Sequence, residues 1–386
     1  MIIKNRKSIW AYSLFVGLVF LVSCTGSKKT DSAKKDSAKN QAEIKFDRTF
    51  NDYALFISGI PAKTGSVLGN TDSNAAFKEH TDAFGKRWDE MEKNRLSLMR
   101  KWAGEEIHNR VNKNLNTFYP FSGPDFLHVY QIFPHSKKYM FLANEPVGDV
   151  PDLKSMNEKD RAEYLKSIAA SLGDIFKRSY FITGRMMSQI PRVKGVIPVF
   201  MVFMARNNCE IINIEKIQLN KDAKTATRAG AAANGLLEGV RFTFRPAGNK
   251  TDVRTLEYFC CDVSDDGLTK TPELLSYITA YGKSNTFVKA ASYLMHYGTF
   301  SKIREKTKEI SAGILEDDTG IPLRYLEGFK PVLFGKYVKP IEDFSGVYQA
   351  DLDKLYKDKS AEVRPLPFSL GYHWKNKDQN YMLFTK

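Results

Sequence analysis

Acidic side chains near glycine or proline are the residues of this chain whose types and spacing could support catalysis. The candidates are Asp125, Glu145 and the adjacent pair Asp317 and Asp318, which lie in turns or at the ends of predicted strands. Two carboxyl groups about 5 to 10 Å apart can cleave a glycosidic bond, one as an acid and the other as a base or nucleophile. An acidic cleft shared by these residues would make the protein a hydrolase of glycan or peptide substrates.

The segment Asp318-Thr319-Gly320 is similar to the catalytic loop of aspartic proteases. That chemistry needs two carboxyl groups sharing a proton at about 3 Å, and the chain contains no second Asp-Ser/Thr-Gly. A turn in which Asp and Gly serve the backbone geometry is therefore the favoured interpretation. The acidic turn 262–267 lacks the spacing of a calcium-binding loop and is also interpreted as a solvated turn.

The six histidines show neither HxH nor HExxH spacing, so we expect no metal site. The chain also lacks a Walker loop and a GxGxxG motif, and we expect no nucleotide cofactor. His296, at the end of a predicted apolar helix, and Arg324 are candidate catalytic auxiliaries. A core or capping role for His296 is the favoured alternative. Ser122 does not lie in a GxSxG motif, which argues against a serine nucleophile.

Helical and strand-like segments alternate along the chain that must position these residues. With 386 residues and 42% apolar content, the chain can bury a large core. Apolar residues recur at helical spacing over 70–107, whereas 240–245 alternates apolar and polar residues as a strand does. We therefore predict a mixed α/β (α+β) fold, with a mixed and largely antiparallel sheet and flanking helices. A Ser-Tyr pair on each of two predicted helices raises the hypothesis of two similar lobes, 111–235 and 236–386.

The same patterns predict the individual elements of the body. Ser155 and Glu158 have the spacing of a capping box at the start of a helix. The apolar run 196–205 is rich in β-branched and aromatic residues, as in a buried central strand. The other expected strands are one late in 119–134, and 138–144, 210–219, 254–262, 312–315, 332–338, 368–373 and 381–385; the expected helices are 176–190, a short one from Pro272, 286–296 and 301–311.

The N-terminus has the features of an export signal. Three cationic residues are followed by an apolar stretch, 9–22, which is too short to span a membrane. The sequence Leu21-Val22-Ser23-Cys24 resembles a bacterial lipobox. That resemblance implies that residues 1–23 are removed and that Cys24 carries the acyl chains, such as palmitate. An ordinary signal peptide with an incidental cysteine is the alternative.

The resemblance to a lipobox also predicts the organisation and location of the mature protein. A polar, lysine-rich stretch, 24–46, would be a flexible tether, followed by a helical segment, 47–110, and a mixed body, 111–386. Acyl chains would anchor the protein on the bacterial envelope. The outer membrane is the favoured location, because Thr25 is not the aspartate that favours the inner membrane.

The positive charge bears on the partners of the protein. The formal charge is +14, of which the three cationic residues of the signal carry +3. An exported protein seldom meets nucleic acid, so anionic envelope lipids or glycans are the better partners; a generally basic proteome is the alternative explanation. In an oxidising compartment Cys209 could pair with Cys260 or Cys261, but three unpaired cysteines are favoured. The oligomeric state stays open.

Several phrases in the body resemble a family of uncharacterised exported bacterial proteins, from about residue 115 to the C-terminus. The phrases are 119–126 (YPFSGPDF), 145–148 (EPVG), 291–296 (ASYLMH), 317–322 (DDTGIP) and 366–368 (LPF). The resemblance implies one continuous unit but brings no assigned activity. The favoured function is a lipid-anchored envelope protein that acts as a binding or structural module. The alternative is an envelope hydrolase.

Overall fold

The computed structural model describes residues 46–61, 64–70, 74–181, 193–228, 230, 235–375 and 378–386. These residues belong to one compact unit, Lys45–Lys386. The predicted signal peptide, the lipidation site Cys24 and almost the whole tether lie outside the described residues.

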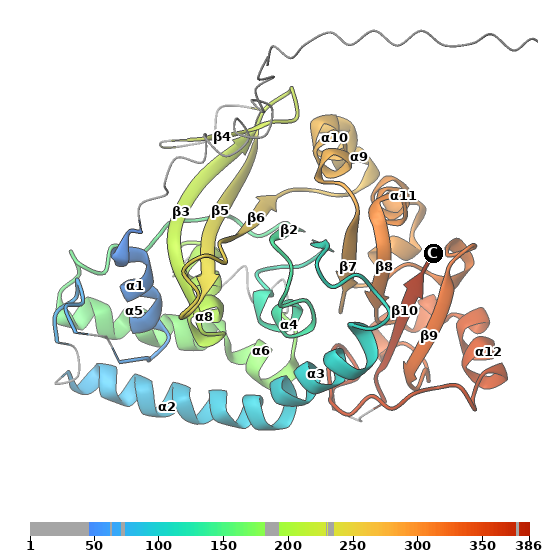
Figure 1. The fold of residues 1–386 in the computed structure, drawn as a ribbon, viewed down its shortest axis with the longest axis horizontal. Helices are drawn as coiled ribbons and strands as arrows, with labels where there is room; N and C mark the ends of the chain where they lie inside the picture. Colours follow the sequence, from blue (N-terminus) through green and yellow to red (C-terminus); the bar gives the residue numbers. More distant parts are fainter. Residues whose placement is uncertain are drawn as a thin grey trace, which may run out of the picture. The chain divides into compact units, whose positions relative to one another are not determined.

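A ten-stranded mixed sheet forms the centre of the unit (Figure 1). Its strand order is β4-β3-β5-β6-β2-β1-β7-β8-β10-β9. The strands are β1 (Asn116–Pro120), β2 (Lys138–Ala143), β3 (Cys209–Leu219), β4 (Thr225–Thr227), β5 (Leu237–Pro246), β6 (Arg254–Cys260), β7 (Ser284–Val288), β8 (Ser311–Glu316), β9 (Lys330–Gly335) and β10 (Asn380–Thr385). The predicted mixed α/β class is confirmed.

The five central strands, β6, β2, β1, β7 and β8, run parallel, and antiparallel strands flank them on both sides. From β1 the chain adds β2, goes on to β3 and β4 at the far edge of the sheet, and fills the positions between with β5 and β6 before it places β7 and β8 on the other side of β1. This is a doubly wound arrangement whose direction changes between β1 and β7. Strands from 111–235 and 236–386 therefore interleave in one sheet, and neither range has a sheet of its own.

Helices cover both faces of the sheet. The α-helices are α1 (Arg48–Ile57), α2 (Ala75–Met91), α3 (Ser97–Trp102), α4 (Phe126–Ile132), α5 (Glu158–Ser171), α6 (Gly173–Arg178), α8 (Ile197–Arg206), α9 (Asp265–Lys270), α10 (Pro272–Tyr281), α11 (Ser301–Ile310) and α12 (Ala350–Asp358). Two π-helical turns, η1 (Glu92–Leu96) and η2 (Ala103–Ile107), extend α2 and α3 into one helical run, and the 3-10 turns are η3 (Leu294–His296), η4 (Gly298–Phe300), η5 (Leu323–Tyr325) and η6 (Glu342–Val347).

The central strands are buried on both faces, and each face packs into a separate hydrophobic core. Phe118 and Met140 pack with α9 to α12, whereas their chain neighbours Tyr119 and Phe141 pack with α1 to α5 and α8. Side chains alternate between the faces of a strand, so a strand covered on both faces is apolar at consecutive positions. This is why the central strands show no alternating pattern in the sequence.

The run 196–205 forms helix α8, so its prediction as a strand is wrong. Every residue of 197–205 is buried, and a helix without a polar face has no period to detect. Pro198 lies in its first turn, where the missing N–H is tolerated. The helix packs against α1 and β3.

Four further predictions are wrong. The strand expected late in 119–134 is helix α4, and the helix expected over 286–296 is the end of β7 followed by an irregular loop. Residues 368–373 form no strand. Asn157 rather than Ser155 caps α5, because its side chain accepts the hydrogen bond from the Asp160 N–H at 2.9 Å.

Most of the remaining predicted elements have clear local sequence patterns and agree with the structure. The long helical run, the helices starting at Pro272 and Ser301, and the strands corresponding to β2, β3, β5, β6, β8, β9 and β10 are confirmed. Cys209, Cys260 and Cys261 are unpaired. Helix α6 ends at Arg178, and most of the helix predicted over 176–190 lies outside the described residues. Among the described residues, no helix has both the length and the apolar character needed to cross a membrane.

Candidate functional site

The candidate carboxylates follow parallel strands of the sheet. Asp125 follows β1, Glu145 follows β2, and Asp317 and Asp318 follow β8. The carboxyl ends of parallel strands meet at one edge of a sheet, and doubly wound proteins bind ligands at this edge, where the strand order reverses. In this protein the reversal lies between β1 and β7. We therefore use the name switch-point site for residues 121–125, Glu145 and the residues that directly follow β7.

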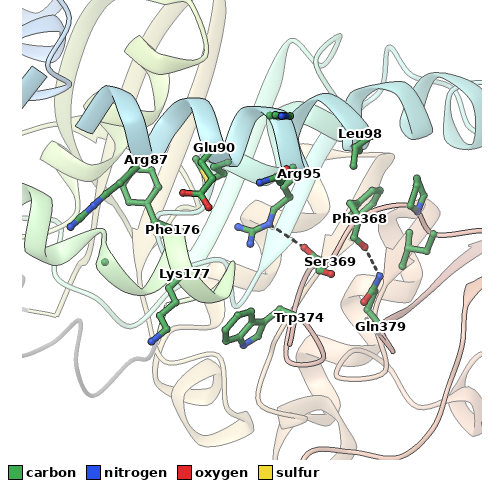
Figure 2. A pocket seen from close by; sticks show the side chains of 16 residues that line it. Arg87, Glu90, Arg95, Leu98, Phe176, Lys177, Phe368, Ser369, Trp374 and Gln379 are labelled. Carbon is green, nitrogen blue, oxygen red and sulfur yellow. Dashed lines mark hydrogen bonds between the residues drawn. The ribbon is translucent and has the colours of Figure 1, made fainter. Parts of the chain in front are cut away.

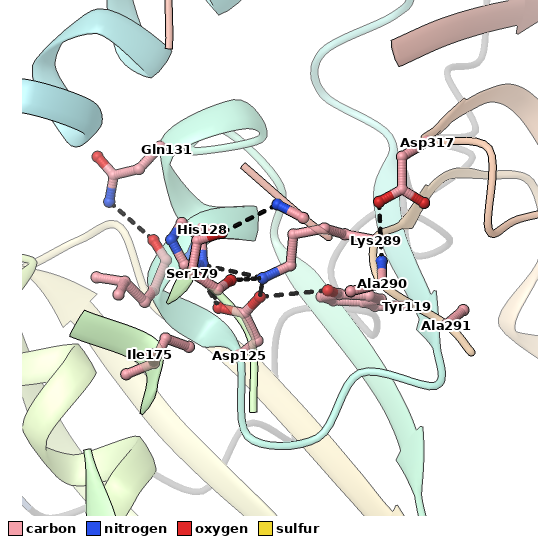
Figure 3. Close-up of polar contacts among 12 residues, drawn as sticks. Tyr119, Asp125, His128, Gln131, Ile175, Ser179, Lys289, Ala290, Ala291 and Asp317 are labelled. Carbon is pink, nitrogen blue, oxygen red and sulfur yellow. Dashed lines mark hydrogen bonds and ion pairs between the residues drawn. The ribbon is translucent and has the colours of Figure 1, made fainter. Parts of the chain in front are cut away.

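A buried ion pair joins the two loops at the reversal. The Lys289 ammonium, directly after β7, lies 2.6 Å from Asp125 Oδ2, and both side chains are 2% exposed. His128 Nδ1 lies 2.8 Å from Asp125 Oδ1. Lys289 also donates to the carbonyl oxygen of Ser179, and the Tyr119 hydroxyl donates to Asp125 at 3.3 Å. Figure 3 shows the Asp125 carboxylate between His128 and Lys289.

The protonation states follow from burial and charge. Burial opposes ionisation of Asp125, but His128 and Lys289 outweigh it and lower the pKa of this carboxyl to about 2. Burial lowers the pKa of His128 to about 4 and also lowers the pKa of Lys289. We assign a neutral His128 that donates Nδ1–H to Asp125, which is itself paired with Lys289. The other ring nitrogen, Nε2, is buried and has no hydrogen-bond partner among the described residues.

Asp125 is also the N-cap of α4, at the end of the loop that follows β1. Its carboxylate accepts the backbone N–H of His128 at 3.2 Å and so begins α4. The negative charge lies at the position where doubly wound proteins with a glycine-rich loop bind phosphate. The first turn of this sheet is therefore unsuited to a phosphate group.

Glu145 is the least satisfied carboxyl group of the site. It is 5% exposed, and its Oε2 atom has no hydrogen-bond donor among the described residues. Burial raises its pKa. Glu145 and Asp125 both line a half-open cavity of about 60 Å³, together with Ser122, Tyr180 and Lys289 among others. That volume corresponds to about two water molecules.

The loops around the cavity have strained backbones. Five of the eight non-glycine residues with positive φ in the described part of the chain lie here: Phe121, Ser179, Ala290, Ser292 and Tyr293, with φ between 49° and 69°. Such conformations cost about 1 to 3 kcal/mol each and concentrate at functional sites. Their concentration in three loops around one cavity indicates that the shape of this edge is specified at the expense of stability.

Asp317 and Asp318 shape the loop after β7 and do not line the cavity. Asp317 accepts the backbone N–H of Ala290 at 2.9 Å, as Figure 3 shows. Asp318 accepts the hydroxyl of Tyr293 at 2.7 Å. Burial raises the pKa of each aspartate to about 6. The two carboxylates are held by different partners, which agrees with the turn interpretation of 318–320 rather than with a protease dyad.

His296 and Arg324 do not line the cavity. His296 Nε2 lies 3.2 Å from the carbonyl oxygen of Asp318, and Arg324 donates to the carbonyl oxygen of His296 at 3.4 Å. Of the six catalytic candidates, the structure therefore brings only Asp125 and Glu145 to one cavity. Within the described part of the chain, no three His, Cys, Asp or Glu side chains are grouped so that they could hold a metal ion.

Comparison with protein families, curated proteins and solved structures finds no match to this chain. The function must therefore be argued from the site itself.

Lys289 and His128 are the functional candidates that sequence reasoning missed. Lys289 falls within the segment predicted as a helix, and His128 within the predicted strand. Assigning 284–288 as a buried strand would have placed Lys289 at a strand end, beside the other candidates. No local signal identifies its partner, because Asp125 is distant in the sequence.

Proposed function

We propose that this protein is a lipid-anchored component of the bacterial envelope that binds a hydroxyl-rich ligand, a sugar, at the switch-point site. The observation that carries the proposal is Glu145, which lines a cavity with room for about two hydroxyl groups and whose Oε2 atom is buried without a donor among the described residues. A buried polar atom left without a partner costs about 1 to 3 kcal/mol, and a ligand hydroxyl removes that cost. In doubly wound sheets an acidic residue after the second strand accepts hydrogen bonds from sugar hydroxyls.

The charge of the site supports a ligand without a phosphate at this position. Asp125 occupies the start of α4 with a carboxylate, and its partner Lys289 is already neutralised by it. Lys289 lines the same wall and has a third N–H besides those directed to Asp125 and to the carbonyl oxygen of Ser179, so a pair of adjacent hydroxyls would find both an acceptor and a donor.

Affinity for vicinal hydroxyls tests the sugar-binding proposal. We expect calorimetry to detect binding of chitobiose or of methyl β-D-ribofuranoside, and the 2-deoxy riboside to bind at least tenfold more weakly. A site built to bind a hydroxyl group discriminates strongly against an analogue that lacks it. Glu145→Gln should weaken binding at least tenfold, because the amide replaces a charged acceptor by a weaker one.

Asp149→Asn is the matched control for Glu145→Gln. Asp149 belongs to the same loop, but it is 57% exposed and pairs with Lys216 outside the cavity. Its replacement should leave sugar affinity unchanged. Equal binding of the ribosides, or equal loss of affinity in the two variants, would contradict the proposal.

Glycoside hydrolysis is a second candidate function, favoured by one observation. The two carboxyl groups that line the cavity have pKa values displaced in opposite directions, downward for Asp125 and upward for Glu145. Such a difference separates a base or nucleophile from a general acid. Release of reducing sugar that Glu145→Gln and Asp125→Asn both abolish would favour hydrolysis, and binding without release would favour the sugar-binding module.

In this proposal, acylation of Cys24 anchors the protein to a membrane of the bacterial envelope. We expect the wild-type protein in the membrane fraction, with a mass that includes acyl chains on Cys24, and Cys24→Ser in the soluble fraction. Two or more acyl chains give stable anchoring, since each buried methylene contributes about 0.8 kcal/mol. Cys209→Ser is the control, because that thiol is buried in the body, and it should leave fractionation unchanged. An unmodified Cys24 would contradict the anchor.

A further inference from the structure

A second, much larger cavity lies outside the switch-point site, between the long helical run, α6 and residues 366–369, Trp374 and Gln379 near the C-terminus. Its volume is about 1020 Å³, and it is half-open to solvent. Ligand-binding pockets commonly have volumes of about 300 to 1000 Å³. The cavity is therefore large enough for a ligand of the size of a single-chain lipid.

The charge of this cavity is strongly one-sided. Four cationic side chains line it, against the single carboxylate of Glu90; the cations are Arg87, Lys93, Arg95 and Lys177. Arg87, Lys93 and Lys177 have no ion-pair partner within the described part of the chain and are exposed. Unpaired cations around a concavity attract an anion, because the low-dielectric walls focus their field.

Arg95 is held in place more firmly than the other cations. Its Nε donates to the carbonyl oxygen of Ser369 at 3.1 Å, and its Nη1 donates to that of Ile175 at 3.4 Å. Its Nη2 has no partner among the described residues, so it is left to bind a ligand. A carbonyl oxygen does not neutralise a guanidinium, and Arg95 keeps its positive charge at the wall of the cavity.

The segment that carries Arg95 has an unusual backbone. Lys93, Asn94 and Arg95 belong to η1, a π-helical turn within the long helical run. Turns of this kind are rare and occur often at functional sites. Here the wider turn directs three consecutive residues toward one cavity.

Apolar side chains line the cavity at both ends, whereas the labelled cations lie toward one end. Figure 2 shows Arg87 and Lys177 at one end, with Phe176 beside Arg87 and Trp374 near Lys177, then Arg95, and Leu98 and Phe368 at the other end. Leu366 and Pro367 add further apolar surface to the lining. The cavity thus has a cationic end that includes two aromatic side chains, and an apolar end at Leu98 and Phe368.

We infer that this cavity binds an amphipathic anion, namely a lipid with a single acyl chain and a phosphate head group. The cationic end would bind the phosphate through Arg87, Lys177 and Arg95, which form charge-assisted hydrogen bonds with such groups. The apolar end would cover part of the acyl chain. Lipid binding here would not require a ligand at the switch-point site, although the Asp125 carboxylate of that site acts electrostatically on Arg95.

Titration with three probes tests this inference, the two amphiphilic ones being used below their critical micelle concentrations. The protein is the full chain with Cys24→Ser, so that it carries no acyl chain of its own. We expect dodecyl phosphate to bind at least tenfold more tightly than inorganic phosphate, which lacks the chain. It should also bind at least tenfold more tightly than dodecyl maltoside, which lacks the charge. Circular dichroism of each mixture verifies that the amphiphiles leave the fold intact.

Charge reversal at two neighbouring positions of one helix distinguishes binding in the cavity from non-specific attraction of the anion to the basic surface. Arg87→Glu should weaken dodecyl phosphate binding at least tenfold, whereas Lys86→Glu, on the neighbouring exposed residue outside the cavity, should change it less than threefold. Leu98→Asn should weaken binding of dodecyl phosphate but not of inorganic phosphate.

Three outcomes would overturn the inference. Equal affinity for inorganic phosphate would show that only an anion is bound, and equal affinity for dodecyl maltoside would show that the charge has no role. Equal effects of Arg87→Glu and Lys86→Glu would show non-specific attraction.

Discussion

Replacement of Lys289 by methionine is expected to destabilise the protein by about 3 to 5 kcal/mol. Methionine retains the length of the side chain but removes the charge, so Asp125 would remain as a buried carboxylate without its cationic partner. The loss of one partner from a buried ion pair typically costs this amount. Urea denaturation followed by circular dichroism measures the difference in the free energy of unfolding.

Two further variants show whether the effect comes from the unpaired charge. Lys357→Met removes an equally short ion pair with Asp353, but there the lysine is 74% exposed, so the loss of stability should be far smaller than for Lys289→Met. The double variant Lys289→Met with Asp125→Asn removes both charges and should recover part of the lost stability. If Lys289→Met cost no more than Lys357→Met, the ion pair would not be the connection between the two loops that we describe.

Replacement of Gly148 by alanine is expected to destabilise the protein by about 2 to 5 kcal/mol. Gly148 has φ of +74°, and a Cβ atom on it would overlap the carbonyl group of Lys194. Overpacking of this kind typically costs about 1 to 3 kcal/mol, and the left-handed backbone adds about 1 to 2 kcal/mol for alanine. The same loop carries Glu145, so the variant should also weaken sugar binding.

Gly248→Ala is the matched control for this prediction. Gly248 has a similar φ of +82°, but no atom lies within 4 Å of the position that its Cβ would occupy. The control should therefore cost only the conformational strain of about 1 to 2 kcal/mol. Equal destabilisation in the two variants would mean that the close approach of residues 148 and 194 does not constrain the loop.

The close approach at Gly148 also explains why Glu145 remains buried. Val196 N–H donates to the carbonyl oxygen of Pro146 at 3.1 Å, and Asp149 N–H donates to that of Lys194 at 2.8 Å. These bonds attach the loop after β2 to the segment before α8. The short phrase 145–148, noted in the sequence as part of a resemblance, therefore holds an acidic side chain at the edge of the sheet.

Local patterns predicted the elements that have a clear period or a clear boundary. Strand β5 alternates apolar and polar residues over 240–245, and α10 begins at Pro272. The prediction of α8 and β7 was wrong, because both are buried on all sides and their residues show no alternation. The periodicity of a segment reports which of its faces meets water, so a segment without such a face gives no signal.

The sequence by itself determined the mixed fold class and which carboxylates stand at strand ends, because local propensity and turn residues act over a few positions. Only the tertiary structure decided that Asp125 meets Lys289 and that Glu145 Oε2 remains without a donor, whereas Asp317 accepts the Ala290 N–H and Asp318 accepts the Tyr293 hydroxyl. Those outcomes depend on strand order and burial, which long-range packing sets. An aspartate or glutamate looks the same in the sequence whether its role is catalytic, ligand-binding or structural. Its burial and its partners in the folded protein distinguish these roles.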